Sequence, residues 1–179
     1  MGIRVIMDQV LNHSSDRCRW FEESRKSKDN PYRNYYIWHD GKPDGSEPNN
    51  WGNRFREGNG SAWTFDEATG EYYLHQYSAK MPDLNWEYPP LRQELYKMLR
   101  WWLEMGVDGF RFDAVKYIYF GDTAQSVDFW EWYMQELRAI KPDIYCVGEC
   151  WSGDSEVLEY YTAIENGITP VYNREDGTR

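Results

Sequence analysis

The sequence has few cysteines, and their number and spacing exclude several kinds of site. The 179 residues include three, Cys18, Cys146 and Cys150. The number is odd, so at least one thiol has no partner within the chain, and the spacing fits no zinc-binding template. We therefore expect free thiols, which are typical of a reducing compartment. No signal-peptide pattern opens the chain either, so we expect a cytoplasmic location.

Long hydrophobic runs and an excess of positive charge are also lacking. No apolar stretch approaches the roughly 18 residues that a membrane-spanning helix requires. The formal net charge is -10, from 20 Lys and Arg residues against 30 Asp and Glu residues. A field of this sign repels nucleic-acid phosphates and anionic lipid headgroups. We therefore expect neither nucleic acid nor a membrane as a partner.

Aromatic residues are abundant, at 18% of the chain with 10 Trp and 15 Tyr. Such rings suit both core packing and stacking against the faces of sugars, and we expect most of them in the core. From Ser14 to about Pro90 the hydrophobic periodicity gives way to Asn, Gly, Asp, Pro and aromatic residues. This composition predicts a loop-rich insertion, with a small hairpin around "YYLHQY".

The rest of the sequence alternates strands and helices. Proline at the entrance and Gly106 at the end mark one helix, in "PPLRQELYKMLRWWLEMG". A second amphipathic helix ends at Pro142. Three short apolar segments predict the strands: "IRVIMDQV", residues 107–113 and "IYCVGE". This order is typical of an α/β protein with a parallel sheet.

Charged residues fall where the predicted strands end. Asp8, Asp113 and Glu149 lie at or near the carboxyl ends of the three strands. In parallel sheets the functional groups gather at these ends. Arg111 shares a face with Asp113 because strand side chains alternate with a period of two. The alternative is that Arg111 and Asp113 form an ion pair that only stabilises the sheet.

Two neighbouring carboxyl groups favour one reaction in particular. Asp113 and Glu149 are about one βαβ unit apart, so they should project from adjacent strands. Retaining glycoside hydrolysis uses two carboxyl groups about 5 Å apart, one as nucleophile and one as a protonated acid. Arg111 would keep the nucleophile ionised and oriented, and burial together with the charge of the neighbouring carboxylate would raise the pKa of the acid.

Four short segments resemble the α-amylase family, glycoside hydrolase family 13, in the family's order and at similar spacing. They are "DQVLNH" (8–13), "MPDLNW" (81–86), "GFRFDAVKY" (109–117) and "VGECW" (147–151). The chain most resembles the group intermediate between oligo-1,6-glucosidases and neopullulanases. The resemblance implies an α/β fold: a partial (β/α)8 TIM barrel, about strands 3 to 5, with a loop-rich inserted domain after strand 3.

The resemblance also implies the domain limits. Residues 1–13 would form barrel strand 3, residues 14–88 the inserted domain, and residues 89–179 the barrel from helix 3 through strand 5 and the following helix. The family's further catalytic aspartate, in a His-Asp pair after the seventh strand, has no match here. We therefore interpret the chain as an internal fragment of the catalytic barrel, and expect it to be inactive alone.

The resemblance assigns roles to individual residues. Asp113 is implied as the nucleophile, Glu149 as the general acid/base and Arg111 as the partner of the nucleophile. Four further positions match residues that contact or line the sugar subsites: Asp8, His13, Lys116 and Tyr117. The family usually has histidine where this chain has Tyr117, which leaves the leaving-group contacts open.

A structural calcium ion and a substrate class follow from the same resemblance. Asn12 and Asp83 match positions that bind calcium in many α-amylases, where oxygen ligands suit a hard cation. No organic cofactor is expected. Ala114 is small, and relatives that cut α-1,6 bonds tend to have valine there. We therefore predict hydrolysis of α-1,4-linked glucans or malto-oligosaccharides by a covalent glycosyl-enzyme intermediate.

Three other functions stay open at this point. The chain could belong to an α-1,6-glucosidase, or to a transglycosylase or isomerase that passes the glycosyl intermediate to a sugar instead of water. It could also belong to a non-catalytic barrel used for binding, which would be expected to have lost its carboxylates. Both Asp113 and Glu149 are present, which favours an enzyme.

Overall fold

The computed structural model describes residues 2–164, apart from the side chains of residues 154, 156, 162 and 163. It divides into two compact units, one of Met1–Leu11 with Tyr96–Arg179 and one of Asn12–Leu95. The predicted inserted domain, 14–88, lies within the second unit. The end of the predicted third region, 165–179, lies outside the described residues.

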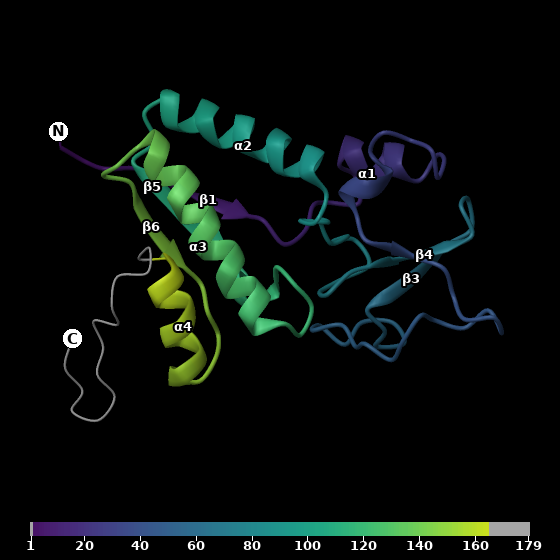
Figure 1. Ribbon diagram of the computed structural model, residues 1–179. Coiled ribbons are helices and arrows are strands. Elements are labelled where there is room, and N and C mark those ends of the chain that lie inside the picture. Colours follow the sequence, from purple (N-terminus) through teal and green to yellow (C-terminus); the bar gives the residue numbers. More distant parts are fainter. Residues whose placement is uncertain (1, 165–179) are drawn as a thin grey trace. The chain divides into compact units, whose positions relative to one another are not determined.

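The first unit contains a three-stranded parallel sheet. Its strands are β1 (Ile6–Val10), β5 (Gly109–Asp113) and β6 (Tyr145–Gly148), in the order β1-β5-β6 (Figure 1). Asp8 pairs in register with Arg111, and Val10 with Asp113. The three predicted strands and their parallel arrangement are therefore confirmed.

Three helices follow the strands, with ends that the sequence explains. They are α2 (Pro89–Glu104), α3 (Thr123–Ile140) and α4 (Asp154–Ile164). The first turns of α2, through Leu95, belong to the second unit. Gly106 follows α2 with a φ of 96°, a left-handed conformation that glycine adopts at little cost. Asp122 caps α3, and its carboxylate accepts a hydrogen bond from the Gln125 backbone N–H at 2.9 Å.

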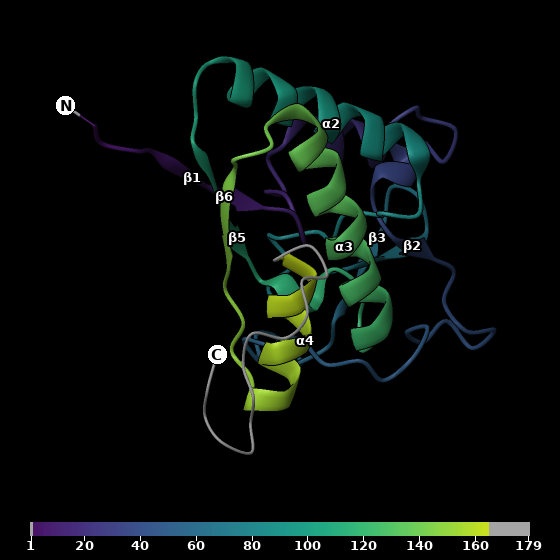
Figure 2. The same ribbon diagram turned by 60° about the vertical axis from the view of Figure 1, so that its left-hand side comes forward.

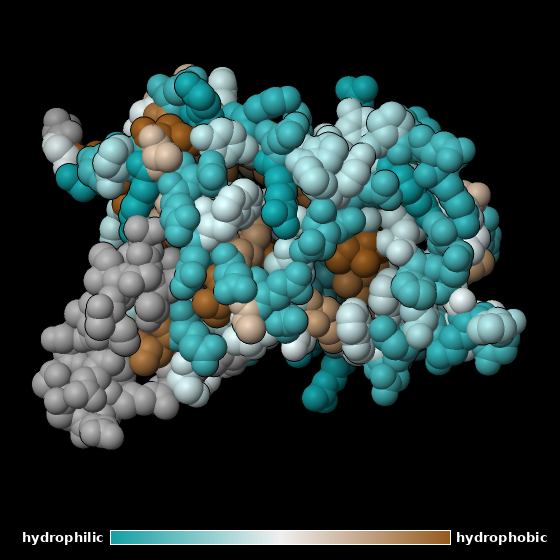
Figure 3. Space-filling model, viewed as in Figure 1, coloured by the Kyte–Doolittle hydropathy of each residue, from teal (hydrophilic) through white to brown (hydrophobic). Residues whose placement is uncertain are grey.

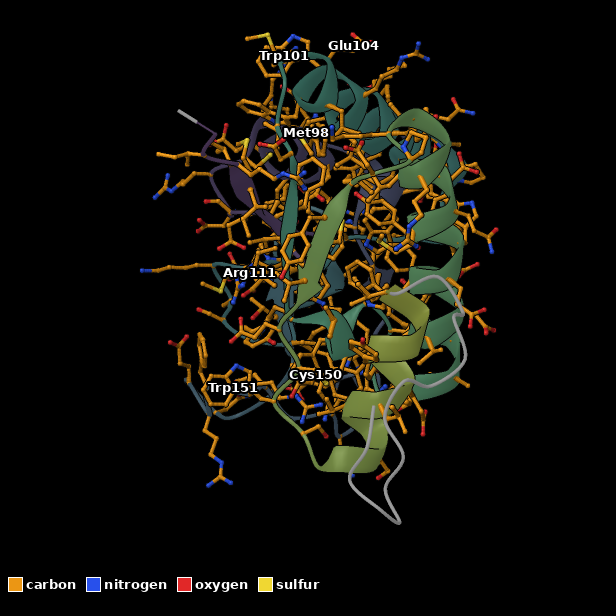
Figure 4. All side chains as sticks on the ribbon, turned by 90° about the vertical axis from the view of Figure 1, so that its left-hand side faces the viewer. Met98, Trp101, Glu104, Arg111, Cys150 and Trp151 are labelled. Atoms are coloured by element: carbon orange, nitrogen blue, oxygen red, sulfur yellow. The ribbon has the colours of Figure 1, made fainter. Side chains whose placement is uncertain are left out.

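Alternation along β5 separates an apolar face from a polar face. Phe112 is buried, and its ring centroid lies 4.7 Å from that of Trp130 and 5.8 Å from that of Tyr133, both on α3. Figure 2 shows α3 and α4 together on one side of β6, and Figure 4 shows Arg111 on the opposite side of the sheet from these helices. The helices therefore cover the face that carries Phe110 and Phe112, and the other face carries the charged residues.

Two glycines allow close packing around β6. A Cβ atom on Gly109 would overlap the backbone carbonyl of Tyr145 on the neighbouring strand. A Cβ atom on Gly148 would overlap the Ile164 side chain and lie 2.8 Å from Cγ1 of Val115. Both positions therefore require glycine because neighbouring atoms fill the space of a side chain.

The second unit contains a small antiparallel sheet. Its elements are α1 (Arg19–Ser24), the 3-10 helix η1 (Arg33–Tyr35), and strands β2 (Trp38–His39), β3 (Trp63–Asp66) and β4 (Glu71–Leu74). The strand order is β2-β4-β3. Strands β3 and β4 form a hairpin, so the predicted hairpin around residues 72–77 is confirmed, although its strand lies slightly earlier.

Buried ion pairs hold this loop-rich unit together. Arg33, only 4% exposed, donates hydrogen bonds to the Ser24 carbonyl at 3.0 Å and pairs with Glu71. Its guanidinium carbon also lies 3.4 Å from the centroid of the Trp38 ring. These contacts satisfy the charge in the interior, where an unpaired guanidinium would be costly.

The surface is largely hydrophilic in the view of Figure 3, with apolar atoms showing in several places. Two of the exposed apolar residues, Met98 and Trp101, lie on α2 (Figure 4), and a third, Met105, directly follows this helix. Within residues 2–164, no helix is both long enough and apolar enough to cross a membrane.

Candidate active site

Four of the predicted site residues meet on the polar face of the first unit's sheet. Asp8 lies on β1, Arg111 and Asp113 lie on β5, and Glu149 follows β6 directly. The Glu149 backbone N–H donates to the Phe112 carbonyl at 2.8 Å, which continues the strand pairing by one residue. Parallel pairing therefore places these charged side chains together on the polar face, at or near the carboxyl ends of the strands.

The Arg111 guanidinium is the centre of this cluster. Its Nη1 donates hydrogen bonds to Asp8 Oδ1 at 2.8 Å, to Asp8 Oδ2 at 3.0 Å and to Asp113 Oδ1 at 2.8 Å. Its Nη2 forms an ion pair with Oε2 of Glu149. These contacts raise the pKa of Arg111 above its usual value, and the hydrogen bond to Asp8 contributes most. The single guanidinium of Arg111 is therefore paired with three carboxylates.

The cluster is more exposed than a structural ion pair would be. Side-chain exposure is 31% for Arg111, 29% for Asp113, 28% for Glu149 and 61% for Asp8. Exposed ion pairs contribute little to stability, at most about 1 kcal/mol. The three carboxylates also outnumber the single guanidinium, so mutual repulsion offsets part of that gain. The arrangement favours a chemical role over a purely stabilising one.

The environment of Glu149 differs from our expectation. We expected burial to keep this carboxyl protonated, but Glu149 is more than a quarter exposed and pairs with Arg111. Within the described residues its side chain also accepts a hydrogen bond from the indole N–H of Trp151. Trp151 was not among the predicted site residues, because it lies beyond the end of β6, where no strand alternation indicates which way a side chain points.

The chain turns sharply after Asp113. Ala114 has a φ of 53° and a ψ of 40°, a left-handed conformation that strongly disfavours β-branched side chains. The 3-10 helix η2 (Val115–Tyr117) follows, and the Trp130 indole N–H donates to the Val115 carbonyl at 2.7 Å. The backbone conformation therefore gives a reason for a small residue at position 114 that is independent of the substrate.

Lys116 and Tyr117 lie in the loop that follows β5. Lys116 Nζ donates to Ser152 Oγ at 3.0 Å and lies 5.6 Å from the centroid of the Tyr117 ring. Both side chains are partly exposed. Lys116 thus links the loop after β5 to the loop after β6, and the substrate contacts that we predicted for these two residues remain predictions.

The second unit brings together the other three predicted site residues. His13 and Asp83 form an isolated antiparallel bridge, and Nδ1 of His13 lies 3.0 Å from Oδ1 of Asn12. The His13 ring centroid lies 5.5 Å from that of Tyr77, which in turn lies 5.4 Å from that of Phe55. We call His13, Tyr77 and Phe55 the aromatic row. Phe55 is 54% exposed, which makes its ring available for a sugar face.

Sequence reasoning missed Tyr77 and Phe55. Both lie in loop segments without hydrophobic periodicity, and many aromatic residues of the insertion are buried. The available signal was weak: Phe55 is a large apolar residue between charged residues in a glycine-containing loop.

The predicted calcium site does not fit the observed contacts. Asp83 is fully buried, and its two carboxylate oxygens accept hydrogen bonds from Gln76, Oδ1 from the backbone N–H at 3.1 Å and Oδ2 from Nε2 at 2.8 Å. Burial raises the pKa of Asp83 to about 7. The Asn12 side-chain oxygen contacts His13.

Calcium requires six to eight oxygen ligands. Within residues 2–164, no group of three His, Cys, Asp or Glu side chains is placed to hold a metal ion. Gln76 thus donates hydrogen bonds to both oxygens of the Asp83 carboxylate, which we expected to bind a cation.

Comparison with known proteins identifies the family. The family model of the α-amylase catalytic domain matches residues 1–176. The chain belongs to the α-amylase family. The resemblance that we drew from four short segments is therefore confirmed.

Among the α-amylase-family relatives are oligo-1,6-glucosidases. That of Halalkalibacterium halodurans is 62% identical over 117 residues, which cover 65% of this chain and 20% of that protein. That of Heyndrickxia coagulans is 45% identical over 200 aligned residues, which cover 97% of this chain and 35% of that protein. The chain thus spans about a third or less of the length of these relatives.

Solved structures support the same fold. The trehalose-6-phosphate hydrolase of Bacillus licheniformis matches 90% of this chain and 31% of its own, with a TM-score of 0.80 and 38% identity. A trehalulose synthase matches 82% of this chain and 29% of its own, with a TM-score of 0.67 and 46% identity. The predicted fold class, part of a (β/α)8 barrel, is therefore confirmed.

Proposed function

We propose that this chain forms the catalytic centre of a retaining glycoside hydrolase, with Asp113 as nucleophile and Glu149 as general acid/base. The observation that carries the proposal is the pairing of both carboxylates with the single guanidinium of Arg111, at the ends of adjacent parallel strands. Two carboxyl groups that share one cation lie close together, as a double displacement requires.

The geometry suggests how the reaction proceeds. Asp113 Oδ1 accepts the hydrogen bond from Arg111, so Oδ2 is the oxygen that would attack the anomeric carbon. Glu149 would donate its proton to the glycosidic oxygen as that bond breaks, and then remove a proton from the water that hydrolyses the intermediate. Asp8 in the first unit and His13 in the second are our candidates for contacts to sugar hydroxyls.

For the substrate we propose α-1,6-linked gluco-oligosaccharides, which replaces our prediction of α-1,4 linkages. That prediction rested on the small side chain of Ala114, and the left-handed backbone there offers a different reason for it. The names of the oligo-1,6-glucosidase relatives support α-1,6 linkages.

Isomerisation is the second candidate. The similarity to a trehalulose synthase supports it, because such an enzyme would pass the glycosyl intermediate to a sugar acceptor. The two candidates share Asp113 and Glu149, and they differ in whether water or a sugar hydroxyl attacks the intermediate.

The test uses the full-length protein with isomaltose, maltose and sucrose as separate substrates. We expect fastest turnover of isomaltose, release of glucose and an α-configured product at early times by proton NMR. Asp113→Asn should abolish turnover, and Asp143→Asn, at an exposed position outside the cluster, serves as the matched control. An initial β-configured product would overturn the retaining mechanism. Conversion of sucrose to an isomer would favour the second candidate.

A further inference from the structure

Trp151 is unusually exposed for so large an apolar residue. Its relative exposure is 80%, the highest among the large hydrophobic residues that the structure describes. Leaving an indole ring in water gives up hydrophobic stabilisation that burial would provide. Figure 4 shows Trp151 on the same side of the sheet as Arg111, away from α3 and α4. A residue in this place needs a reason beyond packing.

The indole N–H supplies that reason, because it donates a hydrogen bond to Oε1 of Glu149. The other carboxylate oxygen, Oε2, pairs with Nη2 of Arg111. Each oxygen of the Glu149 carboxyl therefore has its own donor. A carboxyl group held at both oxygens cannot rotate freely about its terminal bond.

The backbone on both sides of Glu149 is fixed as well. Its N–H donates to the Phe112 carbonyl at 2.8 Å, and its own carbonyl accepts from the Val115 N–H at 3.3 Å. The residue after Trp151 is tied down by Lys116, whose Nζ donates to Ser152 Oγ at 3.0 Å. The loop that carries Trp151 is thus anchored to the loop after β5.

We propose that Trp151 is a positioning residue for the general acid/base: its indole N–H holds Oε1 of Glu149 and so fixes the orientation of the carboxyl group that delivers the catalytic proton to the glycosidic oxygen. This inference rests on the proposed hydrolase function. During the first step the O–H bond of the Glu149 carboxyl group breaks and the proton moves to the leaving oxygen, which keeps the electron pair of the broken C–O bond. The new bond forms from Asp113 to the anomeric carbon, and Trp151 keeps its hydrogen bond throughout.

Two variants of the full-length protein separate positioning from sugar stacking. Trp151→Phe keeps an aromatic face but removes the N–H, and Trp151→Ala removes both. If the N–H matters, both variants should lose kcat on isomaltose by about tenfold, as expected for one hydrogen bond to a charged group. KM should stay near the wild-type value. A Phe variant with wild-type kcat would overturn the proposal and indicate a stacking surface.

The leaving group provides a readout that a merely structural role would not change. The 4-nitrophenolate of 4-nitrophenyl α-glucoside leaves with little need for a proton, whereas the alkoxide of isomaltose needs one. Trp151→Phe should therefore slow isomaltose much more than the nitrophenyl glucoside. An equal loss on both substrates would contradict positioning of the acid. Trp101→Phe, which alters a half-exposed tryptophan on α2 outside the cluster, is the matched control and should change the rate on neither substrate.

A spectroscopic experiment decides the inference independently of activity. The indole N–H signal of Trp151 is identified in a 15N-labelled sample as the one lost in Trp151→Phe. We expect this signal to shift, and its hydrogen exchange to speed up, in Glu149→Ala, because the acceptor is lost. An unchanged signal would overturn the positioning role. A wild-type protein without turnover of any tested glycoside would instead contradict the proposed function.

Discussion

The two units of this chain differ in how exposed their paired charged side chains are. In the second unit, Arg33 and Asp66 are almost completely buried, and each has an ion-pair partner. In the first unit, Arg111 and its three carboxylates lie at the open ends of the strands, each more than a quarter exposed. The buried charges of the second unit lie among packed aromatic and aliphatic side chains, whereas the exposed cluster leaves its carboxylates accessible to a ligand.

This difference separates effects on stability from effects on activity. Removing one member of a buried pair leaves an uncompensated charge in the interior, at a cost of about 3–5 kcal/mol. An exposed pair contributes about 1 kcal/mol or less, because water solvates whichever charge remains. Mutations in the second unit should therefore change stability, and mutations in the cluster should change catalysis.

The largest effect is expected at the nucleophile. Asp113→Asn in the full-length protein should reduce kcat by roughly 10⁴-fold or more, as for other residues that act as one catalytic unit. The melting temperature should change little, because Asp113 is exposed and one of three carboxylates around Arg111. Steady-state kinetics and thermal unfolding check both parts. Residual activity above a hundredth of wild type would contradict the assignment.

A backbone contact should give the largest stability effect in the first unit. Gly109→Ala would place a Cβ atom onto the Tyr145 carbonyl, so β5 and β6 would have to separate. We expect a loss of about 4 kcal/mol in the free energy of unfolding, at the upper end for single substitutions. Urea denaturation measures it. Gly153→Ala is the matched control, since nothing lies within 4 Å of a Cβ there.

A pair of arginine substitutions tests the comparison directly. Arg33→Ala should lower the free energy of unfolding by about 3 kcal/mol and leave kcat unchanged for the folded fraction. Arg111→Ala should change stability by less than about 1 kcal/mol but lower kcat strongly. Denaturation curves and kinetics on the same samples check this. If Arg111→Ala proves the more destabilising of the two, the cluster is a structural device.

A smaller effect concerns pH and two buried groups of the second unit. Burial raises the pKa of Asp83 to about 7, above its ordinary value of 3.8. The native state therefore binds the proton more tightly, and this contribution to stability is present at low pH and lost as pH rises towards 7. Burial lowers the pKa of His75 to about 4, from 6.5. Its contribution has the opposite sign, so stability rises with pH between about 4 and 6.5.

Substitutions separate these two opposing contributions. In Asp83→Asn the free energy of unfolding should no longer fall as pH rises towards 7, so only the increase with pH that His75 contributes remains. His75→Gln should leave the falling contribution of Asp83. Each contributes a slope of at most about 1.4 kcal/mol per pH unit. Urea midpoints from pH 4.5 to 8 measure the slopes, and parallel curves for wild type and Asp83→Asn would contradict the prediction.

The smallest effect is expected from a chelator. Because Gln76 donates to both oxygens of Asp83, removal of divalent cations should leave the melting temperature unchanged to within about 1 °C. Thermal unfolding with and without EDTA measures this. A marked drop with EDTA, reversed by calcium, would show that a cation replaces Gln76 on Asp83.

The sequence predicted the first unit well because its signals are local and periodic. Gly106 and Pro142 mark helix ends through backbone chemistry, and the strands follow from short apolar runs. Alternation placed Arg111 and Asp113 on one face, and strand-end positions added Asp8 and Glu149. The family resemblance then supplied the roles of these residues.

The second unit was harder to predict because its contacts join loop residues far apart in the chain. The donation of Gln76 to Asp83 depends on how two loops meet, and no periodic pattern indicates it. The same holds for the contact of Phe55 with Tyr77. The prediction of α-1,4 linkages was not supported, for a different reason. It rested on one small residue, Ala114, whose size can reflect the backbone conformation as well as the substrate.

Gly109 and Gly148 have a consequence for how the active centre tolerates mutation. Neither residue leaves space for a Cβ atom, and they lie near opposite ends of the paired segment of β5 and β6. At Gly109 the separation of the strands that carry Asp113 and Glu149 is thus set by the backbone of Tyr145, whereas Gly148 meets the side chains of Ile164 and Val115. Substitutions among the surrounding side chains can then alter which sugars are accepted without altering the distance between the two reacting carboxyl groups. The backbone that carries the two carboxyl groups is therefore constrained, whereas the side chains around them can vary with the substrate.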